Sequence, residues 1–167
     1  KNKIEPATLD DRYCPIVNLI RQITNMPPTY TTAYDIYSGG EATYTAIFKA
    51  IEEATKYILL EYYIFAPDQT GTALRDLLIK KLNEGLQVYL LVDSMGSIKL
   101  RRSFMKSFED AGGHLCYFHK LGIGGLSSLI NFRNHRKIAI CDGRIAFTGG
   151  VNITDTQDLR LDPTAYH

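Results

Sequence analysis

The chain has 167 residues, of which 45% are hydrophobic and 22% are charged. A chain of this length buries roughly 70% of the surface of its unfolded form, so it can hold one packed domain without disulfides or metals. The composition excludes a disordered tail and a fibrous repeat. Nineteen Lys and Arg residues against 18 Asp and Glu residues give a formal net charge of +1. Bulk charge therefore does not favour nucleic acid as a partner.

The cysteines and two of the histidines indicate neither a disulfide framework nor a metal site. Cys14, Cys116 and Cys141 form no C-x-x-C pair. Cys116 and Cys141 lie in apolar runs, so we expect reduced and buried thiols there. No carboxylate or thiol completes a ligand set around His114 and His119, so we expect no metal at these histidines. No apolar run reaches the roughly 18–20 residues of a membrane-spanning helix.

The amino-terminal part of the sequence predicts a helix followed by an extended segment. Apolar residues recur at helical spacing between positions 16 and 23, directly after Pro15. Pro favours the first turn of a helix, and the pair Pro27-Pro28 ends the pattern. The stretch over residues 31–40 predicts a short strand that ends in a glycine turn.

From residue 41 onward, amphipathic helices alternate with apolar strands. The predicted helices cover residues 41–54, 74–82 and 100–111, and the predicted strands cover residues 57–65, 86–93 and 114–118. This alternation is typical of an α/β fold with a mainly parallel or mixed sheet sandwiched between helices. Ligands gather at the carboxyl ends of such strands, and Asp93 with its small-residue turn lies at one of these ends.

A hairpin is predicted near the carboxyl end of the sequence. Two apolar segments, residues 136–141 and 144–149, flank Asp142-Gly143. Asp-Gly between alternating apolar residues is a strong signal for a tight turn with positive φ angles. We therefore expect two antiparallel strands here.

This hairpin gathers polar side chains of three different kinds. His135 and Lys137 alternate onto one face where the first strand begins, and the return strand brings Gly149, Gly150 and Asn152 back toward His135. An imidazole, an ammonium group and a carboxamide then converge beside bare backbone. Such a set donates hydrogen bonds to anionic oxygens and includes one group able to attack or to carry a proton. The alternative is a hairpin that has polar residues at its open end without any function in binding or catalysis.

The spacing of these residues resembles the signature of the phospholipase D superfamily: H-x-K, four residues, D, six residues, G-G, one residue and N. The residues that supply it are His135, Lys137, Asp142, Gly149, Gly150 and Asn152. The likeness extends over about residues 37–152, which resemble the amino-terminal catalytic half of a bacterial cardiolipin synthase. It implies a phospholipase D-like domain over residues 37–167 with the motif on its C-terminal hairpin, preceded by a helical or extended lead-in over residues 1–36.

The resemblance also implies a mechanism. In this family two such motifs meet in one active site, where one histidine attacks phosphorus to form a phosphohistidine and the other protonates the departing alcohol. Lys137 and Asn152 are then expected to hold the phosphate oxygens. Gly149 and Gly150 are expected to admit the substrate, and Asp142 to support the hairpin. Because lysine supplies the positive charge, we expect no metal and no cofactor.

Four further residues are candidates for substrate contact. Arg133 and Asn134 directly precede His135, and Glu61 and Tyr63 lie at the end of a central strand. For Tyr63, packing in the core is an equal alternative.

A basic cluster accompanies the third predicted helix. Lys99, Arg101, Arg102 and Lys106 are placed by the pattern on its polar face. The cluster is either a solvated surface or a site of attraction for anionic lipid headgroups.

The single motif implies that one chain supplies half of an active site. Only His135 is followed two positions later by lysine, so we expect the chain to be truncated before a second motif. The resemblance implies a phosphatidyltransferase, cardiolipin synthase, acting on the anionic phospholipid phosphatidylglycerol at a membrane surface. Its second half is expected in the same full-length chain or in a homodimer partner. The expected location is the cytoplasmic side of the cell membrane, with attachment that is peripheral or made through segments outside this chain.

Two other classes of protein stay open at this point. A homodimeric phosphodiesterase or nuclease would account for one motif per chain, although the near-neutral charge makes nucleic acid an unlikely partner. A non-catalytic half-domain that binds lipid or a partner is the other alternative.

Overall fold

The computed structural model describes residues 10–26, 33–118 and 133–165. The chain divides into two compact units, Lys1–Ile36 and Tyr37–His167. The first unit contains a short 3-10 helix, η1 (Asp11–Tyr13), and α1 (Cys14–Thr24). The predicted amino-terminal helix is therefore confirmed, and Pro15 occupies its first turn. None of the described helices is both long and apolar enough to cross a membrane.

The strand predicted before the first glycine pair is wrong for residues 33–38. These residues form no regular element and pair with no strand of the described sheet. Tyr34 is 80% exposed and Ile36 is 87% exposed. A strand requires a hydrogen-bonded neighbour, and alternating apolar residues alone do not supply one. Residues 31–32 lie outside the described residues.

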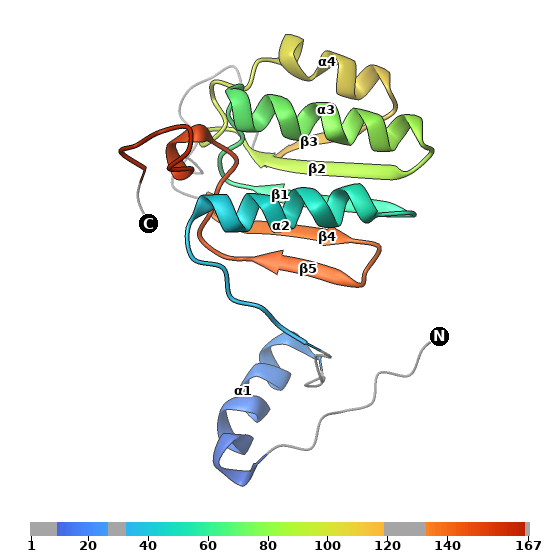
Figure 1. Ribbon diagram of the computed structural model, residues 1–167. Coiled ribbons are helices and arrows are strands. Elements are labelled where there is room, and N and C mark those ends of the chain that lie inside the picture. The colour runs from blue at the N-terminus through green and yellow to red at the C-terminus, as the bar shows by residue number, and fades with distance from the viewer. Residues whose placement is uncertain (1–9, 27–32, 119–132, 166–167) are drawn as a thin grey trace, which may run out of the picture. The chain divides into compact units, whose positions relative to one another are not determined.

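The described residues of the second unit form a five-stranded sheet with three long helices (Figure 1). The strands are β1 (Tyr57–Tyr62), β2 (Gln87–Asp93), β3 (His114–Phe118), β4 (Lys137–Cys141) and β5 (Ile145–Thr148). The helices are α2 (Gly40–Glu53), α3 (Gln69–Asn83) and α4 (Arg102–Asp110), followed near the end of the chain by a 3-10 turn, η3 (Asp155–Gln157).

The strand order β3-β2-β1-β4-β5 makes the sheet mixed. β1, β2 and β3 are parallel, whereas β4 is antiparallel to β1 and to β5. Because β4 runs in the opposite direction, its first residue lies beside the last residue of β1, and Tyr62 pairs with Lys137. The predicted α/β class with a mainly parallel or mixed sheet is confirmed. The motif residues therefore begin at the edge where the parallel strands end.

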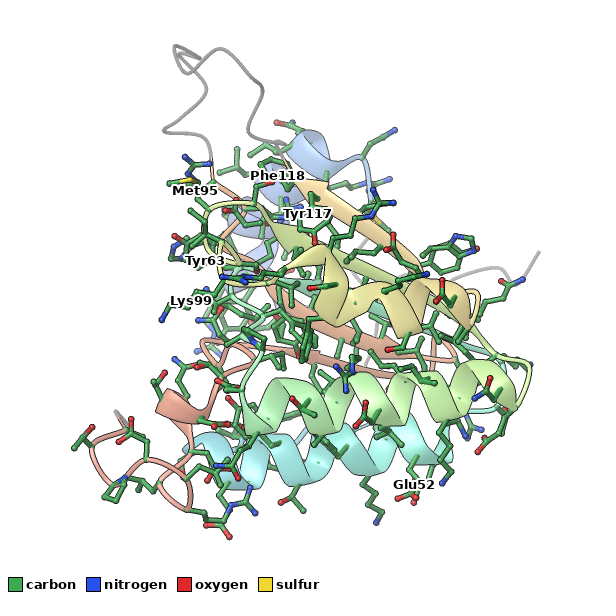
Figure 2. All side chains as sticks on the ribbon, turned by 90° about the horizontal axis from the view of Figure 1, so that it is seen from above. Glu52, Tyr63, Met95, Lys99, Tyr117 and Phe118 are labelled. Atoms are coloured by element: carbon green, nitrogen blue, oxygen red, sulfur yellow. The ribbon has the colours of Figure 1, made fainter. Side chains whose placement is uncertain are left out.

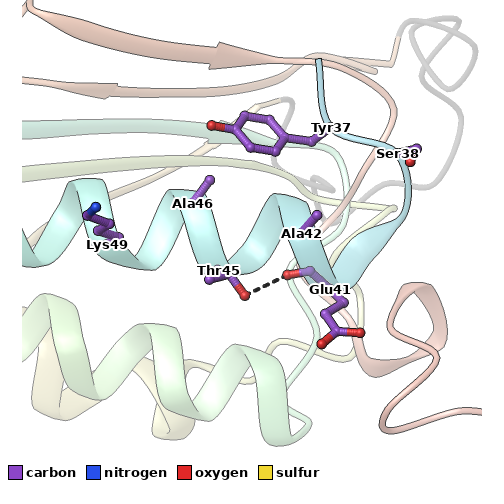
Figure 3. Close-up of a pocket in the computed structure, with 7 residues that line it drawn as sticks. All are labelled: Tyr37, Ser38, Glu41, Ala42, Thr45, Ala46 and Lys49. Atoms are coloured by element: carbon purple, nitrogen blue, oxygen red, sulfur yellow. Dashed lines mark hydrogen bonds between the residues drawn. The ribbon is translucent and has the colours of Figure 1, made fainter. Parts of the chain in front are cut away.

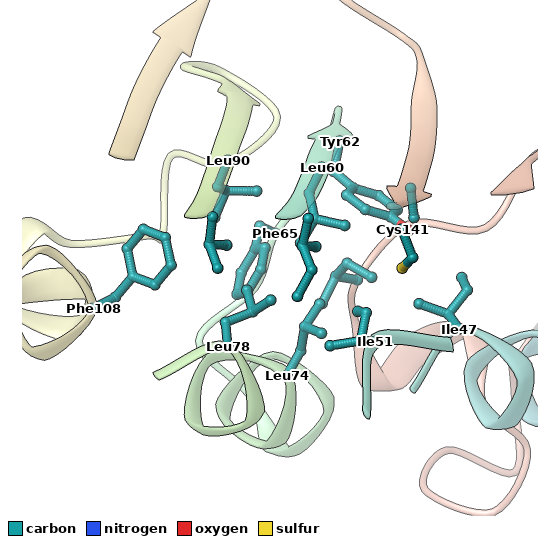
Figure 4. Close-up of a cluster of buried hydrophobic side chains, with 14 of the residues drawn as sticks. Ile47, Ile51, Leu60, Tyr62, Phe65, Leu74, Leu78, Leu90, Phe108 and Cys141 are labelled. Atoms are coloured by element: carbon teal, nitrogen blue, oxygen red, sulfur yellow. The ribbon is translucent and has the colours of Figure 1, made fainter. Parts of the chain in front are cut away.

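The core lies between the sheet and the three helices. Along β1, Ile58, Leu60 and Tyr62 are at most 3% exposed, whereas Leu59 between them is 37% exposed. On the same exposed face, Tyr89 of β2 is 42% exposed. Figure 4 shows the buried side chains meeting those of the helices on one side of the strands, among them Ile47, Ile51, Leu74, Leu78 and Phe108. The described helices of this unit thus cover one face of the sheet.

The cysteines differ in burial because strand residues alternate between the two faces. Cys141 of β4 is buried, as expected, whereas Cys116 of β3 is exposed. The prediction for Cys116 is wrong because its position in β3 points to the face that these helices do not cover. All three cysteines are free thiols. His119 lies outside the described residues.

The basic cluster is not one helical face. α4 begins at Arg102, so Lys99 and Arg101 lie in the preceding loop. The two helical members are paired with carboxylates of the same helix, Arg102 with Glu109 at 3.6 Å and Lys106 with Asp110 at 2.7 Å. The prediction of a single cluster on α4 is therefore wrong, because the helix starts later than the apolar pattern indicated.

Candidate active site

The three residues predicted to be catalytic lie around the end of β1. This arrangement follows from the order and direction of the strands. β4 begins at the edge of the sheet where β1 ends, and the chain that follows β5 returns to the same edge. Three consecutive residues each contact one of them: Tyr62 pairs with Lys137, the ring of Tyr63 lies against that of His135 at a tilt, and Ile64 donates to Asn152.

His135 and Lys137 are direct neighbours. The ammonium Nζ of Lys137 donates to the carbonyl oxygen of His135 at 2.7 Å and lies 3.4 Å from Nδ1 of the imidazole. The same Nζ lies 5.3 Å from the centre of the Tyr63 ring, within cation–π range. Partial burial lowers the pKa of Lys137 below its ordinary value. An exposed imidazole and a partly desolvated cation therefore share one edge of the sheet.

Asn152 is fixed by its backbone and by one atom of its side chain. Its Oδ1 accepts a hydrogen bond from the backbone N–H of Ile64 at 3.0 Å. Its carbonyl oxygen accepts from the Tyr44 hydroxyl at 2.6 Å, and its N–H donates to Oε1 of Gln157. The residue is 7% exposed, and its Nδ2 donates to no described residue. The carboxamide is thus oriented while its two N–H groups are unused by the described part of the chain.

Asp142 joins the tip of the hairpin to the start of β1. Asp142 and Gly143 have φ angles of 56° and 66° in the three-residue turn between Cys141 and Ile145, and Asp and Gly are among the residues that tolerate this left-handed region. The carboxylate of Asp142 accepts hydrogen bonds from the backbone N–H groups of Thr55, Lys56 and Tyr57 at 2.8–3.0 Å. Those hydrogen bonds lower the pKa of Asp142 to about 2. These contacts are at the opposite end of β4 from His135.

Gly149 and Gly150 follow β5 at the edge that holds His135. A Cβ atom built on either residue would meet no described atom within 4 Å, and neither residue has a positive φ. The described structure therefore places no steric demand for glycine at these two positions.

Glu61 contacts the residues on both sides of His135. Its Oε1 accepts from Nδ2 of Asn134 at 2.6 Å and forms an ion pair with Nη1 of Arg136 at 3.6 Å. Among the candidates for substrate contact, Glu61 and Asn134 thus bind each other. Arg133 lies near Asp93, where its charge favours the ionised carboxylate.

Asp93 is a site residue whose role the sequence did not show. It is fully buried, and its carboxylate accepts from the N–H groups of Met95 and Gly96 at 2.9 Å and of Asn134 at 3.0 Å. Burial alone would raise its pKa, but these hydrogen bonds and the charge of Arg133 outweigh burial and leave the pKa below its ordinary value. Asp93 therefore ties the end of β2 to the residue before His135. The position of Asp93 at the carboxyl end of a predicted strand was the sequence feature that could have indicated this role.

Gly96 and Ser97 hold the segment that follows β1. A Cβ on Gly96 would lie 2.3 Å from the carbonyl oxygen of Tyr63 and 2.8 Å from its ring. The hydroxyl of Ser97 donates to the Tyr63 carbonyl at 3.1 Å and accepts from the Phe65 N–H at 3.0 Å. The ring of Tyr63 lies against that of His135, so the turn after β2 fixes the residue on which the imidazole rests.

Two cavities lie away from these residues. One, of about 480 Å³, runs beside α2 and is shown in Figure 3; the other, of about 440 Å³, lies between α2, the start of α3 and the chain near Arg160. None of the predicted site residues lines either cavity. The first is lined by Tyr37, Ser38, Glu41, Ala42, Thr45, Ala46 and Lys49. The candidate site is instead an edge of the sheet, where His135 is exposed and Asn152 is buried.

The fold and the motif together define a phospholipase D-like domain. Residues 47–160 match the family described as "Cardiolipin synthase, PLD-like domain". The match covers more than half of the chain, and the chain therefore belongs to this family of cardiolipin synthase domains.

Curated relatives agree with the family. The chain is 39% identical over 152 residues to a cardiolipin synthase of Geobacillus sp. (strain WCH70), covering 91% of this chain and 30% of the relative. It is 38% identical over 135 residues to the major cardiolipin synthase ClsA of Bacillus subtilis (strain 168), covering 81% and 28%. The chain thus spans about 30% of the length of these relatives.

A solved structure shows the same fold. NucT from Helicobacter pylori matches with a TM-score of 0.51 and 17% identity over 68% of each chain. At this identity the match describes the fold alone.

Proposed function

We propose that this chain supplies one half of the active site of a cardiolipin synthase, which transfers a phosphatidyl group from one phosphatidylglycerol molecule to another. The observation that carries the proposal is the grouping of His135, Lys137 and Asn152 around the end of β1, in a chain that belongs to the cardiolipin synthase family. The second half of the site comes from another motif, in the same full-length protein or in a second copy. The enzyme works at the cytoplasmic side of the membrane.

The proposed reaction has two displacement steps. An imidazole nitrogen attacks the phosphorus of phosphatidylglycerol, an N–P bond forms, and the P–O bond to the departing glycerol breaks. The histidine of the other half gives its proton to that glycerol. The hydroxyl of a second phosphatidylglycerol then attacks phosphorus, loses its proton to the same histidine, and releases the first imidazole. The products are cardiolipin and glycerol.

Lys137 and Asn152 stabilise both transition states. Negative charge grows on the non-bridging oxygens in the five-coordinate state, and preorganised donors favour that charge more than the ground state. The ammonium of Lys137 is partly desolvated, which strengthens its interaction with an anion. Removal of one such donor typically lowers kcat by about 10²–10³-fold.

The contact of Lys137 with Nδ1 bears on the role of His135. A neutral imidazole that accepts at Nδ1 carries its proton at Nε2, so Nε2 donates a hydrogen bond and cannot attack phosphorus. To attack through Nε2, the ring must carry its proton at Nδ1 and needs an acceptor there. We propose that a carboxylate from the second half supplies this acceptor when His135 is the nucleophile.

The test follows phosphatidyl transfer in the assembled enzyme with phosphatidylglycerol labelled in its phosphate. His135→Asn should abolish transfer, and acid-labile, base-stable label should be trapped on the wild-type protein at a histidine. Lys137→Met should reduce turnover by about 10²–10³-fold, whereas Lys137→Arg should keep part of it because the charge remains.

The competing functions give different results in the same assay. Full activity of His135→Ala would contradict the proposal and favour a binding half-domain. Cleavage of DNA by a dimer, weakened by salt and without phosphatidyl transfer, would favour a nuclease.

A further inference from the structure

The loop between β2 and α4, residues 94–101, lies at the same edge of the sheet as the candidate site. It is anchored at three points, because Asp93 is fully buried, Ser97 is 3% exposed and Leu100 is 5% exposed. Backbone hydrogen bonds from Ser97 to Asp93 and from Leu100 to Ser97, at 2.9 and 2.8 Å, fold it into successive turns. The loop therefore holds the side chains between its anchors in a defined direction.

The exposed side chains of this loop are apolar and basic. Met95 is 37% exposed and Ile98 is 64% exposed, so this short loop presents two large apolar side chains to solvent. Lys99 and Arg101 are exposed beside them. Neither cation has an ion pair within the described ranges, unlike their neighbours on α4.

This surface adjoins the stacked pair of the candidate site. Figure 2 shows Met95 and Lys99 on the same side as Tyr63, with Glu52 far from all three. The ring of Tyr63 contacts the imidazole of His135. The backbone of Gly96, in the middle of the loop, lies directly against Tyr63. Whatever binds the loop is thus placed beside the imidazole.

We propose that residues 94–101 dock this edge of the domain onto an anionic lipid bilayer. Met95 and Ile98 enter the interface between headgroups and acyl chains, and Lys99 and Arg101 bind lipid phosphates. The inference rests on the proposed function, since an enzyme that acts on phosphatidylglycerol must bring its reacting imidazole to the headgroup layer. Two cations that have no ion pair among the described residues, beside two exposed apolar side chains, match the anionic headgroups and acyl chains of such a bilayer.

The sequence offers a direct probe of this contact, because it contains no tryptophan. Ile98→Trp therefore introduces a single indole at the proposed interface. Ile145→Trp is its matched control: Ile145 is 44% exposed and begins β5, at the opposite edge of the sheet. Both variants are mixed with vesicles of phosphatidylglycerol and phosphatidylcholine, some with brominated acyl chains.

We expect the emission of Ile98→Trp to shift to the blue and to be quenched by the brominated chains, while Ile145→Trp stays unchanged. Equal behaviour of the two variants would overturn the proposal. So would an Ile98→Trp shift that depends on protein concentration without vesicles, which would indicate a protein interface instead.

The charges are tested separately. The double substitution Lys99→Gln and Arg101→Gln is made in the Ile98→Trp variant. It should lower the partition coefficient onto phosphatidylglycerol vesicles about 30-fold, because each cation near an anionic surface contributes about 1 kcal/mol to the free energy of binding. The control pair Lys56→Gln with Arg144→Gln changes the same charge at the opposite edge and should have little effect. Equal losses in both pairs, or equal binding to pure phosphatidylcholine, would contradict a specific anionic contact.

The docking and the chemistry fail in distinguishable ways. His135→Asn in the Ile98→Trp background should keep the blue shift although transfer is lost. In the assembled enzyme, the Lys99→Gln and Arg101→Gln pair should lose turnover on vesicles and keep it on dispersed short-chain phosphatidylglycerol. Loss on both substrates would overturn the docking role and leave the transferase proposal standing.

Discussion

The imidazole of His135 lies against the phenol ring of Tyr63, with the ring centroids 3.9 Å apart and the planes inclined by 32°. His135 is exposed, so few other contacts restrict its rotation. Lys137 approaches the same pair, with its Nζ 5.3 Å from the Tyr63 centroid. Tyr63 is therefore the surface against which both proposed catalytic groups are oriented.

The first prediction separates the ring of Tyr63 from its hydroxyl. Tyr63→Phe keeps the stacked surface and should change kcat/KM only a few-fold. Tyr63→Leu removes the flat surface, and a misplacement of the reacting group by about 1 Å can cost about 10²-fold in rate. The measurement is kcat/KM for phosphatidyl transfer in the assembled enzyme, together with the imidazole NMR signals of His135. Equal activity of the two variants would show that the stack does not position the imidazole.

The second prediction concerns Gly96, which lies behind that ring. Gly96→Ala places a Cβ 2.3 Å from the Tyr63 carbonyl oxygen, a backbone atom that cannot rotate away. We expect a lower melting temperature, shifted His135 NMR signals and a reduced kcat. Ser94→Ala, in the same loop, is the control and should leave the His135 signals in place. Unchanged signals in Gly96→Ala would mean that the loop does not support the imidazole.

Much of the fold could be predicted because periodicity reports burial. The three helices and the first three strands of the second unit follow from apolar spacing alone, and β3 has the predicted bounds. Periodicity does not report pairing, which is why the strand expected over residues 31–40 is absent from residues 33–38. It also does not report the face a strand residue occupies, and Cys116 is exposed for that reason.

The candidate site could be predicted in part. The spacing from His135 to Asn152 identified the polar residues that gather around β1. The supports of these residues come from β2 and its loop, through Asp93 and Gly96, more than 30 positions earlier in the sequence. Contacts over such separations depend on the order of the strands, and a single sequence does not specify that order.

The third prediction uses the open space around Gly149. Since an added Cβ meets no described atom within 4 Å, Gly149→Ala should fold with an unchanged melting temperature. If the bare backbone admits the phosphate, the same variant should raise KM or lower kcat. Unaltered kinetics would show that glycine is not required for substrate approach. Gly96→Ala, where the methyl group collides with Tyr63, provides the contrast in stability.

The fourth prediction follows from the environment of Lys137. Burial disfavours its charged form and lowers the pKa below the ordinary value of 10.5. The ammonium is present below that lowered pKa, so binding of a phosphate mimic such as tungstate should weaken as pH rises through it. Lys137→Arg should keep binding to higher pH, because a guanidinium group stays charged up to about pH 12. NMR titration of the lysine Nζ measures the pKa directly, and an ordinary value would contradict the assignment.

The last prediction concerns stability at low pH. Hydrogen bonds from the backbone of Thr55, Tyr57 and Lys56 hold the pKa of Asp142 at about 2, against 3.8 for a free carboxyl group. The folded state therefore binds the proton more weakly than the unfolded state, so this contribution is complete above about pH 4 and disappears as pH falls through 2. Asp142→Asn should lower the melting temperature at pH 7 by several degrees, because one acceptor for these N–H groups is lost. Melting curves of both proteins between pH 7 and pH 2 should converge at the acid end. A difference in melting temperature between the two proteins that stays constant over this pH range would show that the charge of Asp142 does not hold the hairpin to β1.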